Sequence, residues 1–387
     1  ASYGTSGQVF NDPYMAHGLM RVVKGPFQGE SGITAGSAIS PDLTWEKSEQ
    51  YNIGLDLDML NYRLKVKLDY YYKLTSSLIY SVPLPETILL VNKRTENAME
   101  VSNEGIELEL EADILREGPI SWRMKFNMAR NWNRFEKSYS GKDVVDGDGT
   151  LLVAGRPLNG LYVWAHRGYY NSDAEVPRLY KIDGQEIYFN GVATDGISGA
   201  VGNYRLLDLD GDGNPDSYYA GSPLPLAHGG WVNELMWKNF DLNVLVNFTI
   251  GRKMINNRMG LGFSRQSEDG HLTKLFDYRK LSPWDGANKN PNAPAWGNSL
   301  SMNTDSAIEK VHHLALKQIT LGYNLPDRIS KKAGLSGVRF FLTAENLFYL
   351  SNYSGGNPEV VNIYTGRDNG DTYPLPRKYT LGLTLNF

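Results

Sequence analysis

The chain has 387 residues, a formal net charge of -4, no cysteine, 40 glycines and 24 tyrosines. The net charge is slightly negative, so the chain lacks the excess of basic residues that is typical of nucleic-acid-binding proteins. The lack of cysteine excludes disulfides, thiolate metal sites and cysteine catalysis. The sequence contains no run of about 18 apolar residues, which a membrane-spanning helix would need. The length suits two domains or one large β assembly. Tyrosine favours strands and water–lipid interfaces, and glycine favours turns.

The first third of the chain predicts five strands. In four of them apolar and polar residues alternate, which places the two kinds on opposite faces of a sheet. The first strand is weaker, Asn61 makes a tight reversal between the second and third, and residues 116–118 turn the chain between the last two. The five expected strands are 1–9, 51–59, 62–72, 106–114 and 120–128.

The rest of the chain predicts five more strands, and the last of them has the clearest pattern. Its apolar residues Tyr379, Leu381, Leu383, Leu385 and Phe387 alternate with small or polar ones. A short helical turn is expected at 327–333, and some β character at 161–170 and 186–189. The five expected strands are 231–237, 240–250, 314–323, 338–344 and 378–387.

Short and long connections alternate along the chain. The short ones are 60–61, 116–118, 238–239 and 325–336, and the long ones are about 10–48, 75–102, 132–228, 251–311 and 346–377. Outer-membrane barrels have short periplasmic turns and long extracellular loops, whereas a soluble sandwich has no reason to sort loops by length. The pattern therefore predicts an all-β fold, an antiparallel transmembrane β-barrel.

Charged residues occupy the polar face of two of these strands, 62–72 and 106–114. Adjacent strands can pair the basic row with the acidic row, so the charges need not form a substrate site. Substrate contact is the alternative, because residues that line a barrel tune its selectivity. The basic row is Arg63, Lys65 and Lys67, and the acidic row is Glu107, Glu109, Glu111 and Asp113.

One loop has the spacing of a calcium site. Asp208, Asp210, Asp212 and Asp216 supply carboxylates at alternate positions, and Asn214 supplies a backbone carbonyl. Calcium takes six to eight oxygen ligands, and four close carboxylates would repel one another without a cation. Position 12 of the loop, where an EF-hand has a bidentate Glu, is a tyrosine, so water or another loop would complete a structural Ca²⁺ site. The alternative is a turn rich in Asp, Gly and Asn without a metal.

The sequence contains no nucleophile elbow, phosphate loop or zinc-protease motif, which indicates that the protein is not an enzyme. Aromatic residues in the long loops, among them Trp284 and Trp296, could stack on a sugar or contact a partner protein. Loop packing or an interfacial aromatic belt is the simpler interpretation of these residues.

Nine segments in a fixed order resemble the C-terminal part of the SusC/RagA-type TonB-dependent transporters of the Bacteroidetes outer membrane. Each segment alone is weakly specific, but the ordered set is specific and covers nearly the whole chain. The segments are SPDLTWE (40–46), QYNIGLD (50–56), DYYYKLT (69–75), VPLP (82–85), VSNEGIE (101–107), GRPL (155–158), ENLF (345–348), NPEV (357–360) and YPLPR (373–377).

The resemblance implies a 22-stranded outer-membrane barrel of which this chain, residues 1–387, forms the C-terminal part. It also implies an N-terminal plug, energisation through the TonB complex, and a SusD-like surface lipoprotein over a barrel that imports a glycan or a peptide. The aspartate loop matches a segment common in the family, and the C-terminal aromatic Phe387 would belong to the signal for barrel assembly. Because an open ten-strand sheet leaves unpaired edges in lipid, we expect the rest of the barrel to lie upstream or in a second chain.

Two alternatives remain at the level of sequence. The chain could form a self-contained outer-membrane channel, or it could be a secreted β protein that binds glycans with Ca²⁺. The sequence upstream of Ala1 would separate an importer from a channel, and detergent-free recovery as a monomer would favour the secreted protein.

Overall fold

The computed structural model describes most of the chain, and every structural statement below concerns these residues. It leaves out residues 10–11, 13, 28, 85–90, 92, 146–150, 176–177, 181–185, 189–200, 212–215, 258–281, 296–303 and 371.

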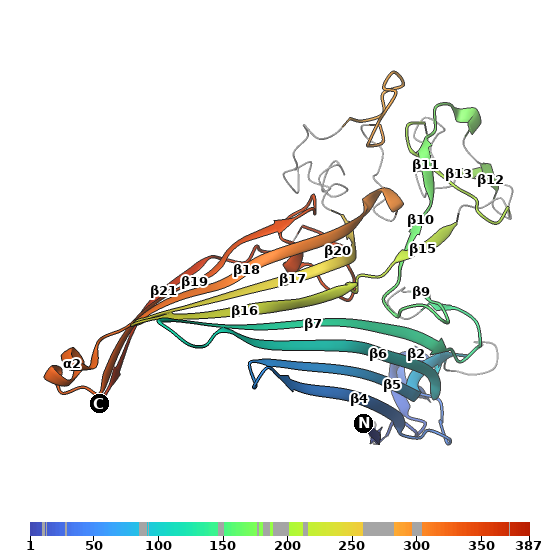
Figure 1. Ribbon diagram of the computed structural model, residues 1–387. Helices are drawn as coiled ribbons and strands as arrows, with labels where there is room; N and C mark the ends of the chain where they lie inside the picture. Colours follow the sequence, from blue (N-terminus) through green and yellow to red (C-terminus); the bar gives the residue numbers. More distant parts are fainter. Residues whose placement is uncertain are drawn as a thin grey trace.

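Ten strands form one antiparallel meander in which each strand pairs with the next member of the series. The order confirms the ten strands that the alternation predicts, and β1 and β21 form the two edges (Figure 1). β19 pairs with β21 from Gly337↔Asn386 to Glu345↔Lys378, as the sequence predicts. In sheet order the strands are β1 (Ser2–Gln8), β4 (Glu46–Met59), β5 (Leu64–Pro83), β6 (Lys93–Leu115), β7 (Ile120–Lys137), β16 (Ala227–Trp237), β17 (Phe240–Asn256), β18 (Ile308–Asn324), β19 (Gly337–Ser351) and β21 (Lys378–Asn386).

The short connections all join strands at one end of the sheet. Leu60, Asn61 and Tyr62 adopt left-handed backbone angles in the β4–β5 turn, which confirms the reversal at Asn61. The expected helical turn between β18 and β19 is present as α2 (Asp327–Ser330) and η5 (Lys331–Ala333). In Figure 1, α2 and the C-terminus lie together at one end, and the small loop strands lie at the other.

Several strands are longer than their alternating segments. The connection between β5 and β6 was expected at 75–102. Because both strands are longer than predicted, it comprises only residues 84–92. A tilted strand needs only about 9–11 residues to cross the hydrocarbon layer. Beyond that layer the outward face need not be apolar, so the strands continue without the alternation and the sequence pattern ends before they do.

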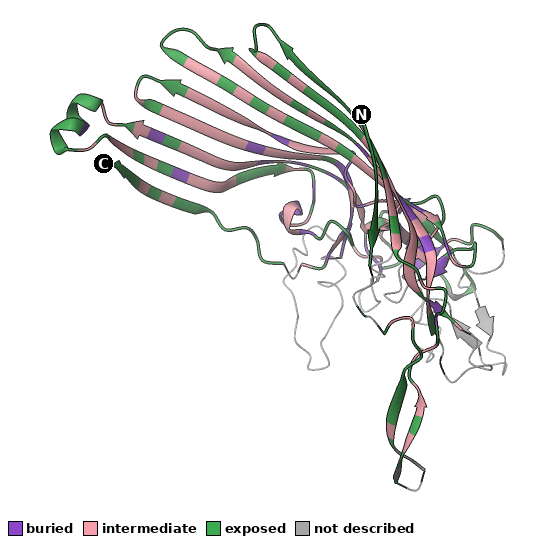
Figure 2. Cartoon of the chain, turned by 90° about the horizontal axis from the view of Figure 1, so that it is seen from below, coloured by how far each residue is buried: buried purple, intermediate pink, exposed green. Residues whose placement is uncertain are grey.

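In most of the ten strands the apolar residues share one face of the sheet, here called the outer face, and the polar ones share the inner face. Val232 and Leu245 are apolar exceptions on the inner face. Leu381, for example, is 81% exposed, and most of the sheet is coloured as intermediate or exposed in Figure 2. No described part of the chain covers these outer side chains, as expected for a lipid-facing surface. Near the short turns, Phe240 contacts Trp237 at 6.2 Å and Tyr323 at 4.7 Å between ring centroids. These rings resemble the aromatic girdle at a membrane interface.

The long connections carry small elements of their own, and buried apolar clusters form where they pack against the long strands. One cluster contains Phe135 and Met99, a second contains Val163 and Ile255, and a third contains Met254, Val311 and Tyr353. The strands are β2 (Met20–Phe27), β3 (Glu30–Ala35), β8 (Val144–Val145), β9 (Leu151–Leu152), β10 (Leu161–Trp164), β11 (His166–Tyr169), β12 (Arg178–Tyr180), β13 (Glu186–Tyr188), β14 (Tyr204–Leu206), β15 (Ser217–Gly221) and β20 (Arg367–Asp368). The one-turn helices are η1 (Asp173–Glu175), η4 (Asp305–Ala307) and η6 (Pro358–Val360).

Candidate functional site

The charged rows of the inner face pair with each other across neighbouring strands. The β5–β6 register places Lys65 opposite Glu111 and Lys67 opposite Glu109, and the Lys67–Glu109 ion pair measures 3.8 Å. This confirms the pairing that the sequence predicts. Arg63 is the exception, because its guanidinium donates to the backbone carbonyls of Asp113 and Ile114 at 3.5 and 3.2 Å.

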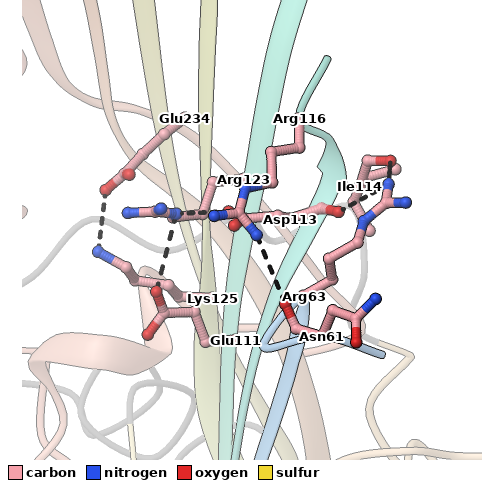
Figure 3. Close-up of polar contacts among 9 residues, drawn as sticks. All are labelled: Asn61, Arg63, Glu111, Asp113, Ile114, Arg116, Arg123, Lys125 and Glu234. Atoms are coloured by element: carbon pink, nitrogen blue, oxygen red, sulfur yellow. Dashed lines mark hydrogen bonds and ion pairs between the residues drawn. The ribbon is translucent and has the colours of Figure 1, made fainter. Parts of the chain in front are cut away.

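The pairing continues over β6, β7 and β16. Arg123 donates to Asp113 at 2.8 Å and lies 3.7 Å from Glu111, and Lys125 donates to Glu234 at 3.2 Å (Figure 3). Exposed pairs of this kind add little stability, about 0–1 kcal/mol each. Their effect is to keep the inner wall polar and close to electrically neutral near the short turns.

The aspartate loop connects β14 to β15, and three of its predicted ligands converge. Asp208, Asp210 and Asp216 each offer an oxygen, and these atoms lie within 4.8 Å of one another. The other two predicted ligands, Asp212 and Asn214, lie outside the described residues. Carboxylates at this spacing are the hard oxygen donors that Ca²⁺ takes, so the described part of the loop fits that ion.

Backbone hydrogen bonds shape this loop and fix its base. Asp208 Oδ1 accepts from Gly211 N at 2.6 Å, and Asp216 Oδ2 accepts from Leu209 N at 2.6 Å. Ala165 N donates to Asp216 O at 3.3 Å, which ties the base of the loop to the link between β10 and β11. These bonds hold two of the three carboxylates of the cluster in place.

The two longest loops meet close to that base. His166 Nδ1 of one loop donates a hydrogen bond to Asp305 Oδ1 of the other, and the Tyr218 hydroxyl donates to Asp305 at 3.2 Å. Trp164 and Thr304 form a β-bridge beside it. Burial, followed by the negative charge of Asp305, raises the pKa of Tyr218, which therefore stays a neutral donor.

Trp284 takes part in the packing between these loops. Its indole Nε1 donates to Asn171 Oδ1 at 3.1 Å, and its ring lies where a Cβ on Gly202 would approach within 2.5 Å. This contact agrees with the simpler interpretation, loop packing, although it does not test substrate binding. Trp296 lies outside the described residues.

Phe387 follows the last strand and is 93% exposed. Its carbonyl accepts a hydrogen bond from the Ser336 hydroxyl at 3.2 Å, and the Ser336 amide donates to Asn386 O at 2.8 Å. The ring is therefore free of contacts that would hide it, while the backbone beside it is fixed. An assembly signal at Phe387 remains a prediction.

Sequence reasoning missed the inner loop, residues 352–366, which folds onto the polar face of the sheet. Arg252 is 5% exposed and donates to the carbonyls of Pro223 and Pro358 at 3.2 Å each, Val361 at 2.9 Å and Asn362 at 2.7 Å. A single arginine thus satisfies four backbone acceptors from two connections.

A second anchor of the inner loop is Glu359. Its carboxylate lies 3.7 Å from His313 Nε2 and 3.1 Å from Lys317 Nζ, both on β18. His313 first and then Lys317 hold the pKa of Glu359 below its usual value, against the opposing effect of burial. The motif NPEV at 357–360 was visible in the sequence, but nothing local indicates that its glutamate meets a strand some 40 residues earlier.

Comparison with known proteins places these features in a family. Residues 1–221 match the family described as TonB dependent receptor-like, beta-barrel. The chain is 27% identical over 413 aligned positions to TonB-dependent receptor P3 of Formosa agariphila, covering all of this chain and 39% of that protein. It is 28% identical to TonB-dependent receptor SusC of Bacteroides thetaiotaomicron, covering 90% of this chain and 33% of that protein.

Solved structures share the fold. The RagAB peptide transporter matches with a TM-score of 0.75 and 24% identity, over all of this chain and 40% of that chain. The "open-open" state of the RagAB peptide importer matches with a TM-score of 0.76. This chain thus spans about 40% of the length of the proteins that it resembles.

Since the family match covers more than half of the chain and the fold agrees with it, the chain belongs to the TonB-dependent receptor-like β-barrel family of outer-membrane proteins.

Proposed function

We propose that the protein to which this chain belongs imports a nutrient, a glycan or a peptide, across the bacterial outer membrane with energy delivered through TonB. The observation that carries the proposal is the ten-strand sheet with an apolar outer face and a polar inner face, in a chain of this receptor family. Within lipid, such a sheet is stable only as part of a closed barrel, because an open edge leaves backbone polar groups without partners. This chain would supply wall, lumen lining and extracellular loops.

The partners follow from the same proposal. A SusD-like surface lipoprotein would cover the extracellular end, and the TonB complex would act through an N-terminal part of the protein. Relatives named SusC and RagAB support this kind of pairing. The role is transport and not chemistry, in agreement with the sequence, which carries no catalytic motif.

Energised uptake by cells tests the import function. We expect a strain that lacks the gene to lose uptake of one glycan or peptide fraction, and the full-length gene to restore it. A protonophore, which removes the energy source of TonB, should abolish the same uptake. Uptake that persists with the protonophore would instead indicate a passive channel, and unchanged uptake in the deletion strain would count against import altogether.

We further propose that the aspartate loop holds a structural Ca²⁺ between Asp208, Asp210 and Asp216, completed by Asp212 and the carbonyl of Asn214. The convergence of three carboxylates supports it. The ion would stabilise the base of the contact between the two longest loops, because Asp216 is bonded to that base.

Removing one ligand tests the ion. We expect Asp210→Asn to weaken Ca²⁺ binding at least about tenfold, because calcium affinity depends on the number of charged ligands. Bound calcium is measured by elemental analysis, and loop order by limited proteolysis with and without a chelator. Asp285→Asn is the matched control, since Asp285 also accepts backbone hydrogen bonds but lies outside the cluster. Equal calcium content in Asp210→Asn and the control would reject the site.

A further inference from the structure

We propose that the outer face of β7 binds the phosphate groups of the glycolipid that forms the outer leaflet of the bacterial outer membrane. The binding groups are Arg130 and Arg134, with Trp132 between them, and these three residues are here called the arginine patch. The proposal concerns the lipid around the barrel and not the transported molecule. It depends on the outer-membrane location of the family and not on the import function.

The register of the strands places the arginine patch on the outer face. Met128 on β7 stands opposite Leu108 on β6, and both belong to the apolar rows of that face. Alternate side chains of a strand share a face. Arg130, Trp132 and Arg134 therefore continue the row of Met128, and they point away from the lumen.

The patch begins at the depth where the hydrocarbon layer ends. Arg130 lies ten positions after Ile120, the first residue of β7. A tilted strand needs about 9–11 residues to cross the layer. The next outward row contains Tyr51, Tyr72 and Trp132 on three strands, which resembles an aromatic girdle at the membrane interface. This end of the strands carries the long loops, so the patch lies at the level of the outer-leaflet headgroups.

Both arginines of the patch keep their hydrogen-bond donors available. Arg130 and Arg134 are exposed, and no described carboxylate forms an ion pair with either guanidinium. The Arg130 guanidinium lies 4.5 Å from the centre of the Trp132 ring. This cation–π contact orients the guanidinium without using its N–H groups. The patch can therefore accept an anion without first breaking another ion pair.

Two acidic residues share this face, and hydroxyl groups bind both of them. Glu104 Oε2 accepts a hydrogen bond from the Tyr70 hydroxyl at 3.2 Å. Glu136 Oε1 accepts one from the Ser102 hydroxyl at 2.5 Å. These bonds draw the carboxylates toward β5 and β6, because Tyr70 belongs to β5 and Ser102 to β6. The guanidinium groups on β7 remain the charges without a partner among the described residues of this patch.

The outer face differs between its two ends. At the long-loop end of β4, Lys47 and Glu49 form an ion pair, so their charges cancel. At the short-turn end, the last outward side chains of β4, β5 and β7 are apolar, namely Met59, Leu64 and Ile120. Within the described parts of these strands, the unpaired positive charge thus lies at the outer-leaflet end.

Charge complementarity identifies the occupant. Arginine binds phosphate through two parallel N–H···O bonds, and basic groups at headgroup level bind anionic lipid headgroups. The glycolipid of the outer leaflet carries phosphates on a sugar backbone, and an indole ring beside the guanidinium groups suits an interface of this kind. The arginine patch therefore fits one phosphorylated glycolipid molecule held against β7.

The test uses the full-length protein, purified in detergent and titrated with lipid A that carries its phosphates. Native mass spectrometry measures the dissociation constant of the tightest bound lipid. We expect replacement of both arginines, Arg130→Gln with Arg134→Gln, to raise this constant at least about tenfold. Lipid A from which the phosphates have been removed should bind the wild type at least as weakly as intact lipid A binds this variant.

The matched control is Arg123→Gln with Lys125→Gln, which removes the same number of positive charges from the inner face of the same strand. It should bind lipid A like the wild type. Migration on a heat-modifiable gel verifies that each variant is folded, and Arg134→Gln alone replaces the double variant if that one does not fold. Equal affinity of the outer-face variant and the control would overturn the proposal, and so would equal binding of lipid A without phosphates.

Discussion

Replacing Gly229 with alanine is expected to prevent normal assembly of the barrel wall. A Cβ at this position would lie 2.0 Å from the backbone oxygen of Asn127 and 2.9 Å from the Cα of Met128. Because both atoms belong to the backbone of β7, no side-chain rotation relieves the clash, and the β7–β16 register must separate locally. Overpacking typically costs about 1–3 kcal/mol, and a clash with backbone falls at or above the upper end.

The assay is heat-modifiable migration of the full-length protein on a denaturing gel, which separates folded from unfolded barrels. We expect little folded protein for Gly229→Ala. Gly4→Ala is the control, because Gly4 is also a strand glycine and a Cβ there meets no described atom within 4 Å. Normal assembly of Gly229→Ala would show that β7 and β16 can separate without cost.

The second large effect is expected at Arg252. Arg252→Ala leaves four carbonyls without their donor, and each buried unsatisfied group costs about 1–3 kcal/mol unless water replaces the bond. The inner loop should detach, so residues 352–366 should lose protection from hydrogen exchange. Arg252→Lys should recover only part of that protection, because an ammonium has three donors and no planar fork.

Arg130→Ala provides the comparison for Arg252→Ala. Arg130 is exposed and lies 4.5 Å from the ring of Trp132, a contact worth about 0.5–1 kcal/mol at such a site. We expect no change in the inner loop of this variant. If Arg252→Ala keeps full protection of 352–366, Glu359 and the apolar contacts suffice, and the buried arginine is not the main anchor.

The alternation of apolar and polar residues predicted the sheet well, because the membrane-crossing part of each strand must face lipid on one side and water on the other. Lipid outside and water inside force alternation, as in Leu381 and Leu383 against Thr380 and Thr384. The same reason explains the failure at strand ends. Outside the lipid layer that requirement ends, so the extensions of β5 and β6 carried no signal and were expected to be loop.

Whether a candidate site could be predicted depended on how far apart its residues lie in the sequence. The aspartate loop could be predicted from the sequence because its proposed ligands are close together in the chain. Three of their carboxylates do converge in the structure. The anchoring of the inner loop was not readable, because Arg252 and its acceptor Pro358 are 106 positions apart. The polar row of His228, Thr249 and His313 on the inner face has the same origin, because these residues become neighbours only through the register of three strands.

Cysteine scanning of β21 tests most directly the claim that this sheet is a wall between lipid and water, and this chain has no cysteine of its own that would interfere. Single cysteines at Thr380, Leu381, Leu383 and Thr384 of the full-length protein are labelled with an environment-sensitive fluorophore in lipid vesicles. We predict quenching by nitroxide lipids at 381 and 383, and quenching by a water-soluble agent at 380 and 384. Equal quenching of all four positions by the water-soluble agent would contradict a membrane-spanning sheet.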